Sequence, residues 1–261
     1  MVPEIQIVRE PAELFRTAAE LFVRAARRAV TDSGRFAVAL AGGSTPRALY
    51  GLLAEERVWR ETMPWEQSHF FWGDERHVLP SHAESNYRMA MEAMLSRVPV
   101  PASNVHRIAS ELAESDEAAR SYERALREFF DLAEGEYPCF DLVLLGIGTD
   151  GHTASLFPGT PALGERCRLV VPNRIEKRRA VRITLTVPVL NNARHAVFLV
   201  SGADKADALA AVIDGPYRPA RFPAQLIRPA WGRFTLIADA AAAARLSRFH
   251  TSARKNFTSA R

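Results

Sequence analysis

The chain has 261 residues, enough for one large domain or two small ones, and 48% of them are apolar and 25% charged. This composition is ordinary for a globular protein and excludes disordered, collagen-like and coiled-coil chains, and no apolar run approaches the ~20 residues of a membrane-spanning helix. The net charge of +4 comes from residues 245–261, which carry five cations and no acid, so the rest of the chain sums to 4 − 5 = −1. A nucleic-acid-binding protein needs a patterned basic face, so we expect neither a nucleic-acid nor a membrane partner. We interpret residues 1–244 as a single domain, whose class and activity follow from the patterns below, and 245–261 as a basic, flexible tail.

The first residues and the cysteines indicate the compartment. MVPEIQIVRE carries acids early and has no apolar stretch, so we do not interpret it as a secretory signal. Cys139 and Cys167 are too few for a disulfide framework, and the chain contains no CxxC motif. We therefore expect a protein of the reducing cytoplasm, and the sequence predicts no particular oligomeric state.

Strand and helix patterns alternate along the chain. In chain order they predict a strand at 5–8, a helix at 11–30, a strand at 36–41, a helix from 46, a strand at 69–73, helices at 85–95 and 114–132, strands at 141–148, 168–172, 182–187 and 196–202, a helix at 203–213, a strand at 234–239 and an alanine-rich helix at 240–247. The proline-rich stretch 216–229 is better explained as a surface loop than as a linker. This alternation predicts a three-layer α/β fold, in which a mainly parallel sheet has helices on both faces, and such sheets bind ligands beyond the carboxyl ends of their strands.

Gly42, Gly43, Ser44, Thr45 and Pro46 follow the second predicted strand. Glycines let a backbone approach a ligand closely, Thr45 can cap a helix, and Pro46 suits its first position. The amides and the dipole at such a helix start bind phosphate. A plain strand-to-helix turn explains these residues as well, and the segment matches neither a dinucleotide nor an ATP-binding motif.

Charged residues follow the third predicted strand, where Asp74, Glu75, Arg76 and His77 come directly after Gly73. Four ionisable groups at the end of a strand indicate a polar site, although an exposed charged loop is the alternative. The spacing of His77 and His82 matches no metal-ligand pattern, so we expect no metal.

The glycine-rich stretch 146–159 is the most informative one. His152 can exchange protons near neutral pH, and Asp150 can orient its imidazole or shape the loop. A lone histidine is usually structural, but one in a glycine-rich loop after a buried strand is a better catalytic candidate. No GxSxG motif is present, so Ser44 and Ser155 are poor candidates for a hydrolase nucleophile.

Lys205 follows the strand at 196–202. The chain has three lysines and 31 arginines, so a lysine at this place suggests a compact charge for a phosphate, with an ordinary helix-surface lysine as the alternative.

Together, GGSTP, FFWGDERHV, SNYRM, LLGIGTDGHTASLFPG, RITLTVPVLNNARH and SGADKA resemble the 6-phosphogluconolactonase family, over about residues 36–240 and in the order of the family. The family shares its fold with the glucosamine-6-phosphate deaminases. The resemblance implies an enzyme of the oxidative pentose phosphate pathway that hydrolyses 6-phospho-D-glucono-1,5-lactone to 6-phospho-D-gluconate without a metal or an organic cofactor.

The resemblance also implies roles for individual residues. His152 matches the general base of the family, with Asp150 beside it, and Arg76 matches an arginine near the lactone. The residues that match the phosphate-binding side are Gly42, Gly43, Ser44, Thr45, Lys205 and Arg182.

Two other functions stay open at this point. The deaminase relatives carry a glutamate five residues after the histidine, where this chain has Phe157. Deamination with isomerisation needs acids that shuttle protons, whereas lactone hydrolysis needs one base and a group that stabilises charge. Phe157 therefore favours the lactonase over the deaminase. The other alternative is a non-catalytic protein that binds a sugar phosphate.

Overall fold

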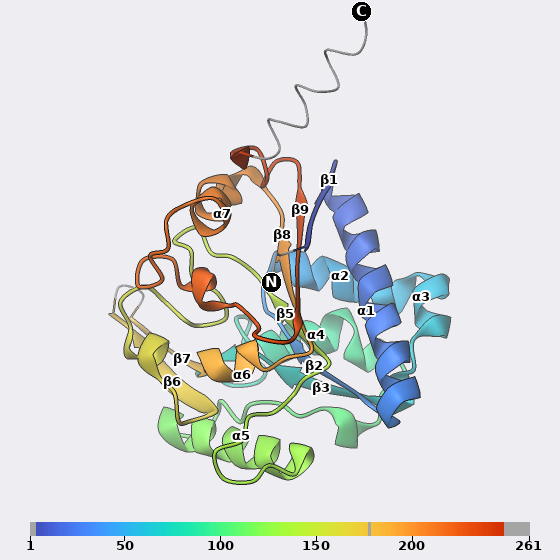
Figure 1. The fold of residues 1–261 in the computed structure, drawn as a ribbon. Coiled ribbons are helices and arrows are strands. Elements are labelled where there is room, and N and C mark those ends of the chain that lie inside the picture. The colour runs from blue at the N-terminus through green and yellow to red at the C-terminus, as the bar shows by residue number, and fades with distance from the viewer. Residues whose placement is uncertain (1–3, 177–178, 248–261) are drawn as a thin grey trace, which may run out of the picture.

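The computed structural model describes residues 4–176 and 179–247. Its main sheet consists of β1 (Glu4–Val8), β2 (Phe36–Leu40), β3 (Ser68–Trp72), β5 (Leu142–Leu145), β8 (His195–Val200) and β9 (Arg233–Asp239). The strands lie in the order β1-β9-β8-β5-β2-β3, and every neighbouring pair is parallel (Figure 1). Three of the four inner strands, β2, β5 and β8, are buried along their whole length, as their continuous apolar runs predict.

Helices cover both faces of this sheet, which confirms the predicted three-layer α/β fold. The helices are α1 (Pro11–Ser33), α2 (Ser44–Glu55), α3 (Arg57–Thr62), α4 (Asn86–Ala93), α5 (Ser115–Phe130), α6 (Val187–Asn191) and α7 (Ala206–Ile213). In Figure 1, α1, α2 and α3 lie on one side of the sheet, and α6 and α7 on the other. The sequence explains both ends of the long helix α1. Proline stands in its first turn, and Gly34 ends it in the left-handed conformation (φ 76°).

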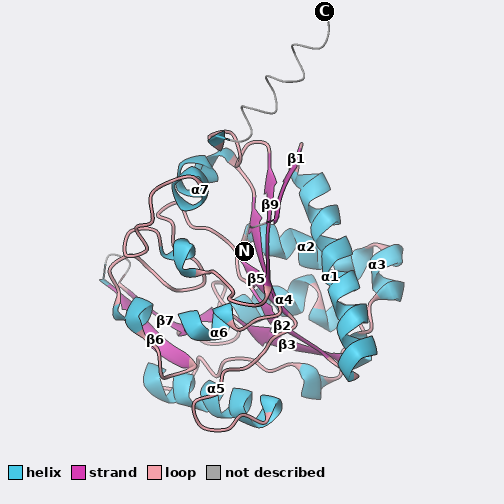
Figure 2. Cartoon of the chain, in the orientation of Figure 1, coloured by secondary structure: helices cyan, strands magenta, loops and turns pink. Residues whose placement is uncertain are grey.

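A second, small sheet stands apart from the main sheet (Figure 2). It contains β4 (Asp74–Arg76), β7 (Ala180–Leu185) and β6 (Val170–Ile175) in that order, and both pairs are antiparallel. The strands expected at 168–172 and 182–187 are therefore present, but they do not join the parallel sheet. Asp74 to Arg76 form a strand where we expected a loop, because three charged residues carry no apolar alternation that a pattern could detect.

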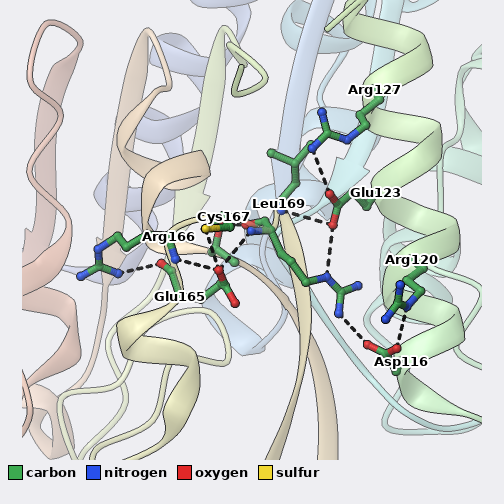
Figure 3. A network of polar contacts seen from close by, with 10 residues as sticks. Asp116, Arg120, Glu123, Arg127, Glu165, Arg166, Cys167 and Leu169 are labelled. Carbon is green, nitrogen blue, oxygen red and sulfur yellow. Dashed lines mark hydrogen bonds and ion pairs between the residues drawn. The ribbon is translucent and has the colours of Figure 1, made fainter. Parts of the chain in front are cut away.

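The segment before β6 is held to α5 by a network of ion pairs and hydrogen bonds (Figure 3). The guanidinium of Arg168 contacts Asp116 at 2.5 Å and Glu123 at 3.5 Å, both on α5. The Glu165 carboxylate accepts hydrogen bonds from the backbone amides of Arg166, Cys167 and Arg168. These contacts fasten the small sheet to the rest of the fold.

Two buried tyrosines complete the backbone of β2 and β3 where these strands end. The hydroxyl of Tyr50 accepts a hydrogen bond from the amide of Ala41 (3.0 Å) and donates one to its carbonyl (2.9 Å). The hydroxyl of Tyr122, from α5, does the same for Trp72 at 2.8 and 3.1 Å. Burial raises the pKa of both phenols, so they remain neutral donors. The loops that follow β2 and β3 therefore start from fixed points.

The last predicted helix, 240–247, is wrong: residues 240–245 form turns. The Asp239 carboxylate accepts a hydrogen bond from the amide of Ala242, and it also bonds Ser201 and Gly202. These bonds favour a turn over the helix that alanine propensity predicts. Of the predicted tail, 248–261 lie outside the described residues, whereas the side chain of Leu246 is buried in the core. Among the described residues, no helix combines the length and the apolar character needed to cross a membrane.

Candidate active site

A cavity of about 230 Å³ lies at the carboxyl ends of the main-sheet strands. Loops after β2, β5 and β8 form one part of its lining, and β4 and β7 of the small sheet form another. The lining contains eight of the nine residues expected from the sequence: Gly42, Gly43, Ser44, Thr45, Arg76, His152, Arg182 and Lys205. The ninth, Asp150, contacts His152 from outside the lining. The fold thus brings together segments that are up to 163 residues apart in the chain (205 − 42 = 163).

The loop after β2 leads directly into α2. The helix begins at Ser44, so Thr45 lies in its first turn and does not cap it, contrary to the expectation. The cap is Gly43, whose φ of 105° suits glycine and which has no side chain to occupy the first amides of the helix. A helix start of this kind attracts an anion. Gly42 is also restricted, because a Cβ there would overlap the amide of Asn86 on α4.

His152 is held by three neighbours. A carboxylate can only accept a hydrogen bond, so the bond between Nδ1 of His152 and Asp150 places the proton on Nδ1 and leaves Nε2 as the basic nitrogen. The ring of Phe157 stacks on the imidazole at 4.1 Å between centroids and 20° between planes. Gly148 lies directly against the ring, since a Cβ at this position would overlap Nδ1 of His152. The imidazole side chain is 19% exposed, so it is enclosed but accessible.

The small sheet contributes two arginines. Arg76 on β4 stands directly opposite Arg182 on β7, and both line the cavity. Arg76 donates a hydrogen bond to the carbonyl of Glu84, while its Nε is buried without a hydrogen-bond partner among the described residues. Like charges directly opposite each other destabilise a sheet, so this pair favours an anionic or electron-rich occupant of the cavity.

The neighbours of Arg76 have separate functions. Glu75 is buried and accepts hydrogen bonds from the amides of Asn86 (2.8 Å) and Tyr87 (2.8 Å) and from the hydroxyl of Ser85 (3.0 Å). Burial raises the pKa of this carboxyl. The three hydrogen bonds to Glu75 fix the start of α4. His77 contacts the carbonyl of Leu112 at 2.8 Å and does not line the cavity.

Lys205 lies in the short helical turn Ala203–Lys205 before α7. Its Nζ is 3.1 Å from Asp204, and its side chain is 27% exposed. Partly exposed ion pairs of this type are weak, so a phosphate can compete with Asp204 for the ammonium group.

The lining residues that were not assigned from the sequence include the buried polar residues Asp74, Asn86 and Ser155. Asp74 belongs to the charged group after β3, and Asn86 and Ser155 lie within the segments that carry the family resemblance. The sequence therefore marked the segment of each residue. No residue pattern distinguishes them from structural residues, because their place depends on contacts between the two sheets. In residues 4–176 and 179–247, no three His, Cys, Asp or Glu residues are arranged to hold a metal ion.

Known proteins are similar to this chain in sequence and in fold. Residues 9–236 match the model of a family described as glucosamine-6-phosphate isomerases/6-phosphogluconolactonase. A 6-phosphogluconolactonase of Synechocystis sp. is 41% identical over 88% of this chain and 92% of its own length. One of Nostoc sp. is 40% identical over 95% and 100%. The solved 6-phosphogluconolactonase of Trypanosoma cruzi is 32% identical, with a TM-score of 0.82 over 94% of this chain and 97% of that one.

Proposed function

The chain belongs to the family of glucosamine-6-phosphate isomerases and 6-phosphogluconolactonases, and from this premise we propose that it hydrolyses 6-phospho-D-glucono-1,5-lactone to 6-phospho-D-gluconate, a step of the oxidative pentose phosphate pathway. The chain is thus a carboxylic ester hydrolase. One observation supports this function above all others: an imidazole with a carboxylate on Nδ1 shares a cavity with a helix start, a lysine and two arginines. The first group can activate water, and the others can hold a phosphorylated, electron-rich substrate.

In this mechanism His152 is the general base. Its Nε2 takes a proton from a water molecule while the water oxygen attacks C1 of the lactone. Arg76 and the amides of the loop after Gly146 stabilise the negative charge that develops on the carbonyl oxygen. When the bond between C1 and the ring oxygen breaks, the imidazolium returns its proton to that oxygen. Asp150 keeps the imidazole in the required tautomer and stabilises its charged form.

The phosphate binds away from the reacting carbonyl, to groups from both parts of the lining. The amides at the start of α2, with Ser44 and Thr45, bind its oxygens, and Lys205 and Arg182 supply positive charge. Because the phosphate is remote from C1, its binding energy fixes the position of the carbonyl and lowers the barrier. This reaction requires no metal and no organic cofactor. We place the enzyme in the cytoplasm, where its free thiols Cys139 and Cys167 remain reduced.

Deamination of an amino-sugar phosphate is the weaker alternative. It requires acids that move protons along an open-chain sugar. Phe157 is buried against the imidazole, so the wall on that side of His152 is apolar. This contact favours lactone hydrolysis.

A stopped-flow measurement with fresh 6-phosphogluconolactone tests the proposal, because ring opening releases a proton from the new acid. We expect a fall in pH well above the enzyme-free rate, and no ammonia from glucosamine 6-phosphate. Ammonia release would instead indicate the deaminase. Binding of 6-phosphogluconate without turnover would identify a non-catalytic binding protein.

A further inference from the structure

The His152 loop meets the small sheet at Ser155. Its hydroxyl donates a hydrogen bond to Asp74 on β4 (2.6 Å), its amide donates to the hydroxyl of Thr184 on β7 (3.3 Å), and its carbonyl accepts from the amide of Asn173 on β6 (2.8 Å). Each polar group of Ser155 therefore contacts a different strand. The residue is 1% exposed, so water does not compete for these bonds.

These contacts lie on the same face of the small sheet as the arginines. Side chains two residues apart in a strand share a face, so Asp74 lies on the face of Arg76, and Thr184 on the face of Arg182. The register agrees, because Asp74 stands opposite Thr184 and Asn173 stands opposite Arg182. The face of the small sheet that carries Arg76 and Arg182 is thus the face that forms hydrogen bonds with Ser155.

The imidazole and the arginines belong to different sheets. His152 is three residues before Ser155, in the loop after β5 of the main sheet, whereas Arg76 and Arg182 belong to the small sheet. A base and a charge-stabilising group must keep a fixed separation to act on one carbonyl. We propose that Ser155 is a positioning residue, which sets the place of His152 relative to Arg76 and Arg182. This inference rests on the proposed lactone hydrolysis.

The hydroxyl of Ser155 also holds Asp74, a carboxylate only 8% exposed in a cavity with two guanidinium groups. With its proton donated to Asp74, the hydroxyl orients that carboxylate instead of acting as a nucleophile. Without the Ser155 hydroxyl, one oxygen of Asp74 loses its hydrogen-bond donor, and the carboxylate can turn toward an arginine. That change would weaken the field the arginines exert on the substrate without removing either one.

Ser155→Ala removes one of the three contacts and tests the proposal. The wild type is assayed first, and if it does not hydrolyse the lactone, the proposed function fails and not this inference. With an active wild type, we expect kcat to fall by about 10–100-fold, because misplacement of reacting groups by about 1 Å has effects of this order. We expect KM to change less than kcat, because the start of α2 and Lys205, which supply most of the phosphate-binding groups, follow strands of the main sheet and not of the small sheet. An unchanged kcat overturns the inference.

Ser68→Ala is the matched control. Ser68 is fully buried, and its hydroxyl donates a 2.6 Å hydrogen bond to the carbonyl of Pro64, but it lies at the opposite end of β3 from the cavity. Both variants lose a buried hydroxyl, so we expect similar changes in Tm and a loss of kcat only in Ser155→Ala. Equal kcat losses in the two variants would indicate general destabilisation and overturn the proposal.

Thr184→Val keeps the proposal testable if Ser155→Ala does not fold. Valine has the shape of threonine but has no hydroxyl to accept the hydrogen bond from the backbone amide of Ser155. We expect kcat to fall with little change in KM, and wild-type kcat in this folded variant would contradict the role of the junction.

Discussion

The two sheets supply different parts of the site. The main sheet contributes groups from the loops beyond its strands: the amides at the start of α2, the imidazole of His152 and the ammonium of Lys205. The small sheet contributes Arg76 and Arg182 from within its strands. Glycine geometry fixes the loop groups, whereas strand register fixes the arginines. The start of α2, which binds the phosphate, and the guanidinium of Arg76, which stabilises charge at the carbonyl, are therefore positioned by different sheets and can be disturbed separately.

The largest expected effect is in the main-sheet loop. We expect His152→Ala to lower kcat by about 10²–10⁴-fold, the usual contribution of a general base. Asp150→Asn should cause part of this loss, since the imidazole keeps its place but loses its charged partner. Steady-state kinetics measures both, and circular dichroism checks that the variants fold. Full turnover by folded His152→Ala would remove the histidine from the mechanism.

The next effect concerns the small sheet. We expect Arg76→Ala to lower kcat by about 10²–10³-fold, as the loss of one group that stabilises an oxyanion does. Arg174→Ala is the control, because Arg174 is exposed and lies on the small sheet at a position that does not line the cavity. The same kinetic assay compares them. If the two variants had equal kcat values, the small sheet would not contribute charge stabilisation to the reaction.

A smaller effect is expected at Lys205, and it should appear in KM and not in kcat. We expect Lys205→Ala to raise KM for the phosphorylated lactone by about 10–100-fold, because a hydrogen bond to a charged group contributes about 1.5–3 kcal/mol. Its kcat should change little. The non-phosphorylated lactone is the control substrate, and its kinetics should not respond. An equal loss with both lactones would show that Lys205 does not bind the phosphate.

Acid should destabilise the main sheet. Burial lowers the pKa of His195 on β8 and of His106 beside β3 from about 6.5 to about 4. In this interval the unfolded chain binds protons at both residues and the folded chain does not. The free energy of unfolding therefore falls as the pH is lowered from 6.5 to 4, and is recovered as it rises. Burial of Glu75, on β4 of the small sheet, has the opposite effect on stability, since the raised pKa of its carboxyl favours proton uptake by the folded chain.

Thermal melts between pH 4 and 7.5 measure this dependence. In His195→Gln the fall of Tm toward acid should be shallower than in the wild type. An identical slope in the two proteins would assign the acid sensitivity to other groups.

The smallest effect tests whether the start of α2 acts independently of the rest of the helix. A Cβ added at Gly51 meets nothing within 4 Å, so Gly51→Ala should raise stability by about 0.5–1 kcal/mol through helix propensity. Calorimetry should show a rise in Tm of about 1–4 °C. Because Gly51 does not line the cavity, KM and kcat should not change. A shift in KM would indicate that phosphate binding depends on the whole helix.

The main sheet could be predicted from the sequence because its inner strands are buried on both faces and are therefore continuously apolar, as in 36–40 and 142–145. The small sheet could not, because its strand Asp74–Arg76 is short and charged, and its register depends on partners about 100 residues away. His152 and Lys205 stood out because both follow strands of the parallel sheet, His152 in a glycine-rich loop and Lys205 as one of three lysines in the chain. Ser155 did not, because its hydrogen bonds come from three separate strands.

The position of β1 has a consequence for synthesis on the ribosome. Among the described residues, this strand forms its ladder only with β9, which is translated more than 200 residues later. The nascent chain must therefore keep residues 4–8 unpaired until the final strand emerges, while β2, β3 and β5 can already associate. Maturation of this edge comes last, and we expect it to be where chaperones are needed most.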